Sequence, residues 1–259
     1  MNNNANISSF KDFQIRAKNY EIQSKWVTDN KINNVPYIFF KKKNNLGNIL
    51  DVGGGTGFLS QYLSDKIPYT SITIVDSSTN MLKKAKERIP HATTVNSSIE
   101  SYCNSNFQKF ETIIVRQILH YVDDVNVIIS LLKEKISNDG IIYIGQFVVP
   151  DKESDKWHEN FIKKISKNRK RSFIYNSFLD IFLQNGFEIV KVETNDYEEN
   201  IQNFYKRKIN SKISYEDLLK ESKETLNDRI IKKLKIRTVN NNLFFTVQFC
   251  HLFLSRKNL

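Results

Sequence analysis

The most informative short stretch of the sequence is ILDVGGGTGFLS, residues 49–60, in which an apolar run leads into a glycine-rich loop. The spacing of Gly53, Gly55 and Gly57 differs from the G-x-G-x-x-G loop that receives a pyrophosphate at a helix N-terminus. Asp51 precedes the loop, and its carboxylate would repel a diphosphate but attract an ammonium group. Opposite charges at ~4 Å attract by about 4 kcal/mol when the effective dielectric constant is about 20. The loop therefore favours a nucleoside that carries an ammonium group.

A second carboxylate, Asp76, ends the next strand-like run, SITIVD. At the end of such a strand, a carboxylate can accept hydrogen bonds from both hydroxyls of a ribose. One helix separates the two runs, so a strand-helix-strand unit would bring Asp51 and Asp76 to neighbouring strand ends. No G-K-[ST] sequence follows the glycines, which excludes a Walker-type phosphate loop.

The segments that must position these residues alternate between strand-like and helix-like patterns, which predicts a parallel sheet covered by helices. The predicted strands are residues 48–53, 71–76, 111–116, 140–149, 187–194 and 243–254. The predicted helices are residues 57–65, 123–136 and 177–186. The pattern therefore indicates an α/β fold.

These motifs resemble those of the class I S-adenosylmethionine-dependent methyltransferases of the small-molecule type. The resemblance covers residues 45–150 well and the C-terminal strand pair loosely. DVGGGTG is similar to the family's D/E-x-G-x-G-x-G loop, and ITIVDSSTNML is similar to its second strand. The resemblance implies a Rossmann-like, doubly wound, seven-stranded and mostly parallel sheet with an antiparallel last strand. It also implies S-adenosyl-L-methionine as the cofactor.

The resemblance further implies which residues bind this cofactor. Asp76 would hold the ribose hydroxyls, and Met81 would cover one face of the adenine. The segment VNSSIES has Ser98 where family members commonly place an Asp that holds the adenine amino group, and Ile99 would pack on the ring. The predicted cofactor-binding residues are Asp51, Gly53, Gly55, Gly57, Asp76, Ser77, Met81, Ser98, Ile99 and Arg116.

The segment IIVRQILHYVDD resembles the family's fourth motif, whose Leu-His pair faces the methyl acceptor. His120 is the candidate catalytic base for a hydroxyl acceptor, because an ordinary histidine pKa of about 6.5 suits a base near neutrality. A packed or capping histidine is the alternative. A ring nitrogen or an anion needs no base, and Arg116, Gln117 and His120 would then only orient the acceptor. The predicted substrate residues are Tyr20, Trp26, Gln117, His120, Gln146, Tyr205 and Arg207.

Two segments lie outside the alternation and are expected to form a cap over the ligand crevice. The first carries aromatic side chains, and the second is charged and helix-like. The predicted divisions are an N-terminal helical cap (residues 1–40), a cofactor-binding core (41–196), a helical lid insertion (197–240) and a C-terminal strand completing the core sheet (241–259).

Composition narrows the class of protein. The formal net charge of the 259-residue chain is +11, but the lysines form scattered clusters that are interpreted as solvated surface. Two cysteines without a CxxC pair predict neither a disulfide framework nor a metal site. The chain starts without a signal-peptide pattern, and its longest apolar run, residues 243–254, is too short to span a bilayer. A cytoplasmic monomer or homodimer that does not bind membranes is expected.

The resulting hypothesis is an enzyme that transfers a methyl group, by in-line displacement, to a nitrogen or oxygen atom of a planar or anionic small molecule. RNA methylation is the first alternative, since the charge would attract nucleic acid, but the chain lacks the N/D/S-P-P-Y/F motif of amino-methylating enzymes. An inactive regulatory protein that binds S-adenosylmethionine is the second. An NAD-linked reductase is disfavoured by the glycine spacing and by Asp51. The identity of the acceptor stays open.

Overall fold

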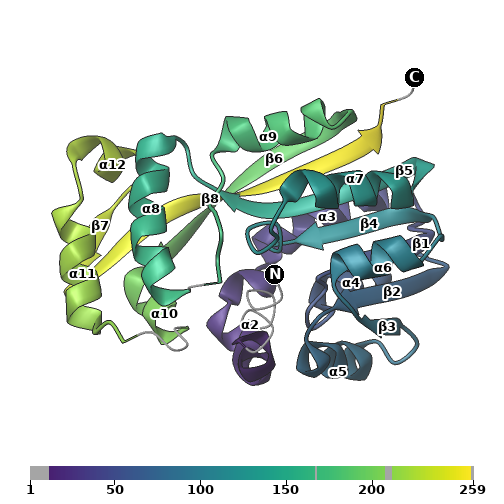
Figure 1. Ribbon diagram of the computed structural model, residues 1–259, viewed down its shortest axis with the longest axis horizontal. Coiled ribbons are helices and arrows are strands. Elements are labelled where there is room, and N and C mark those ends of the chain that lie inside the picture. Colours follow the sequence, from purple (N-terminus) through teal and green to yellow (C-terminus); the bar gives the residue numbers. More distant parts are fainter. Residues whose placement is uncertain (1–11, 167, 208–211, 258–259) are drawn as a thin grey trace.

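A computed structural model describes residues 12–166, 168–207 and 212–257. Its centre is one twisted sheet with the strand order β3-β2-β1-β4-β5-β8-β6 (Figure 1). The strands are β1 (Asn48–Val52), β2 (Ser71–Asp76), β3 (Thr93–Asn96), β4 (Phe110–Arg116), β5 (Ile136–Val148), β6 (Phe187–Asn200) and β8 (Asn242–Arg256). Only β8 runs antiparallel to its neighbours on this path. The predicted doubly wound fold with an antiparallel last strand is confirmed.

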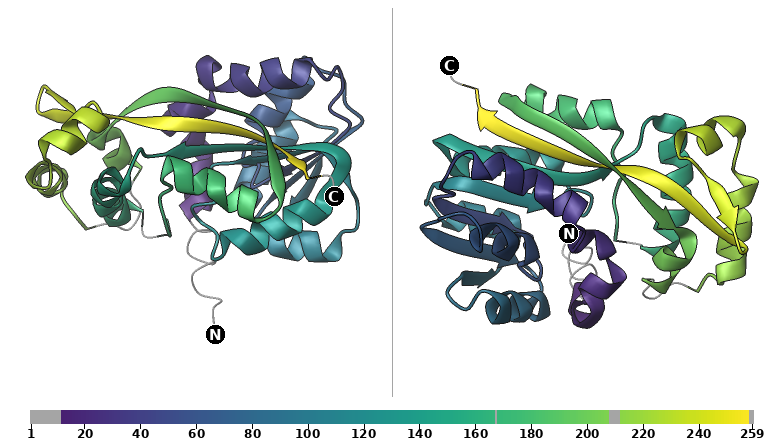
Figure 2. Two further views of the ribbon diagram at one scale, coloured as in Figure 1. Left: turned by 90° about the horizontal axis from the view of Figure 1, so that it is seen from above. Right: turned by 180° about the vertical axis from the view of Figure 1, so that it is seen from behind.

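Helices cover both faces of the sheet because each helix has one apolar side (Figure 2). Leucine, isoleucine and phenylalanine side chains of these helices are buried against the β-branched residues of the central strands. One face is covered by α3 (Asn30–Lys41), α4 (Phe58–Ser64) and α5 (Thr79–Arg88), and the other by α6 (Ile99–Ser105), α7 (Val125–Lys135) and α9 (Tyr175–Gln184).

The parallel register brings the ends of three strands to one edge of the sheet. Asp51 of β1 lies opposite Ile74 of β2 and Ile114 of β4. The loops that follow β1, β2 and β4 therefore leave the sheet side by side. This edge is where ligands bind in open parallel sheets.

A cap is built on the same strands that complete the sheet. β6 and β8 pair beyond the end of β5, and β7 (Arg237–Val239) extends this part as an eighth strand. A separate apolar cluster, centred on Phe161 and Phe245, holds the cap helices on it (Figure 1). These helices are α8 (Lys152–Ile165), α10 (Ile201–Lys206), α11 (Tyr215–Glu224) and α12 (Asp228–Lys233).

The helical part after β6 begins at Ile201, whereas helix was predicted from residue 197, because β6 stays paired with β8 as far as Asn200. The prediction also missed α8, which follows β5 and packs with the cap. The apolar residues of α8 recur with a helical period, but its last lysines belong to a cluster that was interpreted as solvated surface.

The N-terminal segment lies between the core and the cap in Figure 1. It consists of helical residues 12–16 and the short elements η1 (Ala17–Asn19), α2 (Tyr20–Gln23) and η2 (Lys25–Val27). In contrast, α3 belongs to the core layer, since its Val35 and Phe40 are buried against the sheet. Across the described residues, no helix has the length and apolar character needed to cross a membrane.

Candidate functional site

Two adjacent pockets open at the strand ends. The first lies beside the loops after β1, β2 and β4 and is called the cofactor pocket, because most of the predicted cofactor-binding residues line it. The second lies between the N-terminal segment and the cap and is called the acceptor pocket, because predicted substrate residues line it. Phe13, Tyr20, Gln117 and Tyr121 line both. The shared lining makes the two pockets neighbours across a common wall.

The glycine loop is shaped for close approach of a ligand to the backbone. Gly53, Gly55 and Gly57 have φ values of 63°, 55° and 72°, in the left-handed region that favours glycine. Gly55 faces the cofactor pocket, and a Cβ placed there would have no atom within 4 Å. Gly57 instead packs toward Ile74 and Ala85 of the core. Gly57 does not line the pocket, so the glycines divide between ligand approach and packing.

Asp76 lies at the end of β2 and connects the loop to the second strand. Its Oδ2 accepts a hydrogen bond from the Gly55 amide at 2.9 Å, and its Oδ1 accepts one from the Ser78 amide at 2.8 Å. Burial raises the pKa of this carboxyl, and the two amides oppose that rise. Asp76 and Ser77 both line the cofactor pocket. The carboxylate keeps further lone pairs for a ligand.

Asp51 lies deeper than Asp76, in a small recess that adjoins the cofactor pocket. Its side chain is buried, and Ser60 Oγ donates a hydrogen bond of 2.6 Å to its Oδ2. Burial raises the pKa of Asp51 to about 6. Arg116 lines both the recess and the pocket, and it donates a 2.7 Å hydrogen bond to Asn33 Oδ1. One acidic and one basic side chain therefore meet in this recess.

Met81, Ser98 and Ile99, which the resemblance assigns to the adenine, also line the cofactor pocket. Ser98 is also the N-cap of α6, because its Oγ accepts a hydrogen bond from the Ser101 amide at 3.1 Å. The hydroxyl is thus already engaged by the backbone.

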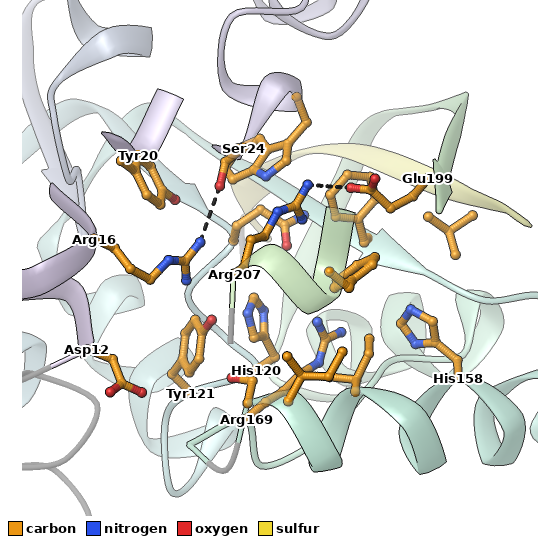
Figure 3. Close-up of a pocket in the computed structure, with 18 of the residues that line it drawn as sticks. Asp12, Arg16, Tyr20, Ser24, His120, Tyr121, His158, Arg169, Glu199 and Arg207 are labelled. Carbon is orange, nitrogen blue, oxygen red and sulfur yellow. Dashed lines mark hydrogen bonds and ion pairs between the residues drawn. The ribbon is translucent and has the colours of Figure 1, made fainter. Parts of the chain in front are cut away.

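The acceptor pocket has aromatic walls and charged side chains (Figure 3). The N-terminal segment contributes Tyr20 and Trp26, and the cap contributes Phe204. Arg207 forms a 2.6 Å ion pair with the buried Glu199, and its Nε donates to the Gln23 carbonyl oxygen at 2.5 Å. This arginine therefore fastens the cap to the N-terminal segment.

His120 forms part of the floor of the acceptor pocket. Its ring Nδ1 lies 3.2 Å from Nε2 and 3.5 Å from Oε1 of Gln146. Nε2 of Gln146 is also 3.4 Å from Gln117 Oε1. Burial and the charge of Arg169 hold the pKa of His120 well below its usual range. The imidazole is therefore neutral at physiological pH.

Most of the predicted residues come together at this edge of the sheet, but four do not line either main pocket. One is Gly57, which packs toward the core as described above. Gln146 is fully buried beneath His120 and contacts it from behind. Tyr205 packs against Tyr215 within the cap, while its neighbour Phe204 faces the pocket. Asp51 faces the recess described above.

Several pocket residues were absent from the prediction. They are Asp12, Phe13, Arg16, Tyr121, Phe147, His158, Arg169, Tyr197 and Glu199. Arg169 belongs to a basic run that was interpreted as solvated surface, and only the fold shows that it turns inward. An arginine among lysines was the available signal, because arginine is preferred where a planar anion is bound.

Comparison with known proteins finds a family match within the core of the chain. Residues 49–140 match the family described as "Methyltransferase domain". A malonyl-[acyl-carrier protein] O-methyltransferase of Acetivibrio thermocellus is 26% identical over 137 residues, which are 52% of this chain and 47% of that protein. The chain spans about half the length of the curated relatives it matches.

Solved structures share the fold over a longer stretch. A structure described as a putative methyltransferase from Bacillus halodurans has a TM-score of 0.72 at 15% identity and covers 83% of this chain and 94% of its own. A SAM-dependent methyltransferase from Archaeoglobus fulgidus has a TM-score of 0.53 at 17% identity, covering 86% of this chain and 94% of its own. At such identities the likeness concerns the fold.

Proposed function

We propose that this chain, whose residues 49–140 match a family described as "Methyltransferase domain", transfers a methyl group from S-adenosylmethionine to a small molecule. The cofactor would occupy the first pocket, and the acceptor's nitrogen or oxygen atom would be presented from the second. The observation that carries this proposal is the common wall between the pockets, formed by Tyr20, Gln117 and their neighbours. Bound S-adenosylmethionine supplies a methyl group that is already activated on a sulfonium sulfur.

The residues of the first pocket fit this cofactor. In the recess, the Asp51 carboxylate suits an ammonium group and the Arg116 guanidinium suits a carboxylate, so the pair complements an amino-acid tail. Gly55 leaves open space on its ligand side. Asp76 would accept the ribose hydroxyls, and Met81 and Ile99 would flank the adenine.

The chain's own contribution is alignment and exclusion of water. Holding two reactants in a reactive geometry can remove roughly 7–11 kcal/mol of barrier. The aromatic walls from the N-terminal segment and the cap would hold a planar acceptor against the common wall. For a hydroxyl acceptor, the neutral His120 would accept the proton as the methyl group is transferred. For a nitrogen or an anionic acceptor, His120, Gln117 and Arg116 would orient it.

The acceptor pocket favours a small molecule over RNA. It is a bounded space between two parts of the chain, whereas a polynucleotide needs an extended basic groove. The relative from Acetivibrio thermocellus is named for an O-methyl transfer, which supports oxygen as one acceptor atom.

Isothermal titration calorimetry with S-adenosylhomocysteine tests the cofactor site. Binding is expected, and Asp51→Ala and Asp76→Ala should each weaken it. Binding of NADH in its place would overturn the proposal. Mass spectrometry of metabolite extracts incubated with methyl-labelled S-adenosylmethionine tests the acceptor class. Tight association with bulk tRNA and a steep dependence on salt would instead favour RNA methylation.

A further inference from the structure

The acceptor pocket holds more positive charge than its own acids neutralise. Three arginines line it, against two acids. Arg207 forms an ion pair with Glu199, and burial raises the pKa of Asp12, which the positive charge of Arg16 lowers. Arg169 forms no ion pair within the described part of the chain, although the carboxylates of Glu159 and Asp155 lie near enough to act on its charge. Among the residues that line the pocket, positive charges outnumber negative charges by one.

The segment around Arg169 is fixed so that this side chain turns inward. The Lys170 amide donates to the His120 carbonyl oxygen at 2.9 Å, and Arg171 Nη2 donates to the Val122 carbonyl oxygen at 3.0 Å. Both neighbours thus bind the backbone of the loop after β4. Arg169 Nε donates to the carbonyl oxygen of Arg171 at 3.2 Å, which orients the guanidinium.

Two guanidinium nitrogens have no partner. Nη2 of Arg169 and Nε of Arg16 are inaccessible to solvent and have no hydrogen-bond acceptor among the described residues. An unsatisfied buried donor is costly, and more so on a charged group. Arg16 is otherwise held by its Nη2, which donates to Ser24 Oγ at 3.3 Å, and by the rings of Phe13 and Tyr20. Both arginines are therefore held in place with donor capacity to spare.

The two arginines act on one part of the pocket. The positive charges of both arginines lower the pKa of His120. In the view of Figure 3, the His120 ring lies between Arg16 and Arg169. His120 and His158 add no charge of their own, since burial keeps both imidazoles neutral. Neither arginine lines the cofactor pocket. An anion bound by them would lie away from the methyl group that is transferred.

We propose that Arg16 and Arg169 bind a carboxylate of the acceptor as an anchor, while a different atom of the acceptor receives the methyl group. The two oxygens of a carboxylate suit the planar guanidinium donors, which are rigidly held. The aromatic walls suit an aromatic body attached to that carboxylate. This inference rests on the proposed function, because it assigns the second pocket to the acceptor.

Ligand-observed NMR on the full chain saturated with S-adenosylhomocysteine tests the anchor. The probes are benzoate, phenyl phosphate and benzamide. Benzoate should bind most tightly, and Arg169→Gln should weaken it by about 10- to 100-fold, as expected for a hydrogen bond to a charged group. Arg16→Gln should weaken it in the same direction. The matched control is Arg229→Gln, an exposed cap arginine that does not line the pocket and should leave benzoate binding unchanged.

Two further measurements keep the outcomes separate. The affinity for S-adenosylhomocysteine should be the same in all variants. If the wild-type protein does not bind S-adenosylhomocysteine at all, the proposed function is refuted and not the anchor alone. Arg169→Lys, which keeps the charge, should bind benzoate better than Arg169→Gln and guards against a merely misfolded variant. Equal affinity for benzamide and benzoate, tighter binding of phenyl phosphate, or benzoate binding that is insensitive to both arginines would overturn the anchor.

Discussion

The side-chain amide of Gln146 lies directly against Nδ1 of His120, with its nitrogen at 3.2 Å and its oxygen at 3.5 Å. Gln146 is fully buried, so this contact is sheltered from water. When the amide oxygen accepts from Nδ1, the lone pair of His120 lies on Nε2. When the amide nitrogen donates to Nδ1, Nε2 carries the proton and the ring can only donate there. Gln146 thus determines whether His120 can act as a base.

The first prediction concerns His120 itself. His120→Gln should lower kcat by about 100-fold or more if a hydroxyl is methylated, because the step loses its proton acceptor. Steady-state kinetics with the acceptor identified by mass spectrometry would measure this. The affinity for S-adenosylhomocysteine should not change, since His120 does not line the cofactor pocket. If kcat falls by well under tenfold, His120 is not the proton acceptor and only orients the substrate.

The second prediction concerns Gln146. Gln146→Glu would place a carboxylate against Nδ1, which raises the pKa of His120 and fixes the proton on Nδ1. The pKa, followed by NMR of the labelled imidazole, should rise toward the ordinary value. Gln146→Leu should leave the pKa low. Identical titration of the two variants would contradict the contact.

The third prediction is a pH dependence of cofactor binding. Burial raises the pKa of Asp51 to about 6, and only the charged form attracts an ammonium group. The affinity for S-adenosylhomocysteine, measured by calorimetry, should therefore fall as the pH decreases through about 6. Asp51→Asn should bind weakly and should lack this dependence. A wild-type affinity that is constant from about pH 8 to about pH 5 would be incompatible with this role.

The fourth prediction concerns stability. Ionisation of Asp51 should favour cofactor binding but should lower the free energy of unfolding of the ligand-free protein. A carboxyl whose pKa is raised on folding stabilises the protein below its unfolded value of 3.8, and this contribution is lost as the pH rises through about 6. At neutral pH the buried charge therefore destabilises the ligand-free protein. Asp51→Asn should increase the free energy of unfolding at about pH 7.5 by about 1–3 kcal/mol, with little change at about pH 4. Denaturant titrations at both pH values measure this.

The fifth prediction separates the two kinds of glycine in the loop. Gly55→Ala should weaken cofactor binding more than it lowers stability, because the added methyl group would enter the open pocket. Gly57→Ala should mainly lower the melting temperature, because its methyl group would lie 3.2 Å from Ile74 Cδ1 and 3.3 Å from Ala85 Cβ. Both substitutions carry the strain of a left-handed backbone, so each is the other's control. Equal effects on both properties would contradict the division.

The sequence predicted the lining of the cofactor pocket better than that of the acceptor pocket, for a physical reason. Asp51, Gly55 and Asp76 lie at strand ends, where a regular register fixes their relation. Arg16 and Arg169 meet only because the N-terminal segment and the cap fold over the same loop. Contacts between segments so far apart in the chain leave no local pattern. The long pairing of β6 with β8, which forms the cap, was likewise hidden, because residues 194–200 of β6 contain Tyr197 as their single apolar side chain and so lack a strand-like alternation.

The unbroken course of β6 and β8 from the sheet into the cap has one more consequence. Two continuous paired strands leave no hinge at this boundary, so the cap and the sheet must move as one body. The N-terminal segment, in contrast, is held against both by non-covalent contacts, such as Glu21 to Arg88 on the core side and Gln23 to Arg207 on the cap side. Admission and departure of reactants should therefore be controlled by this segment.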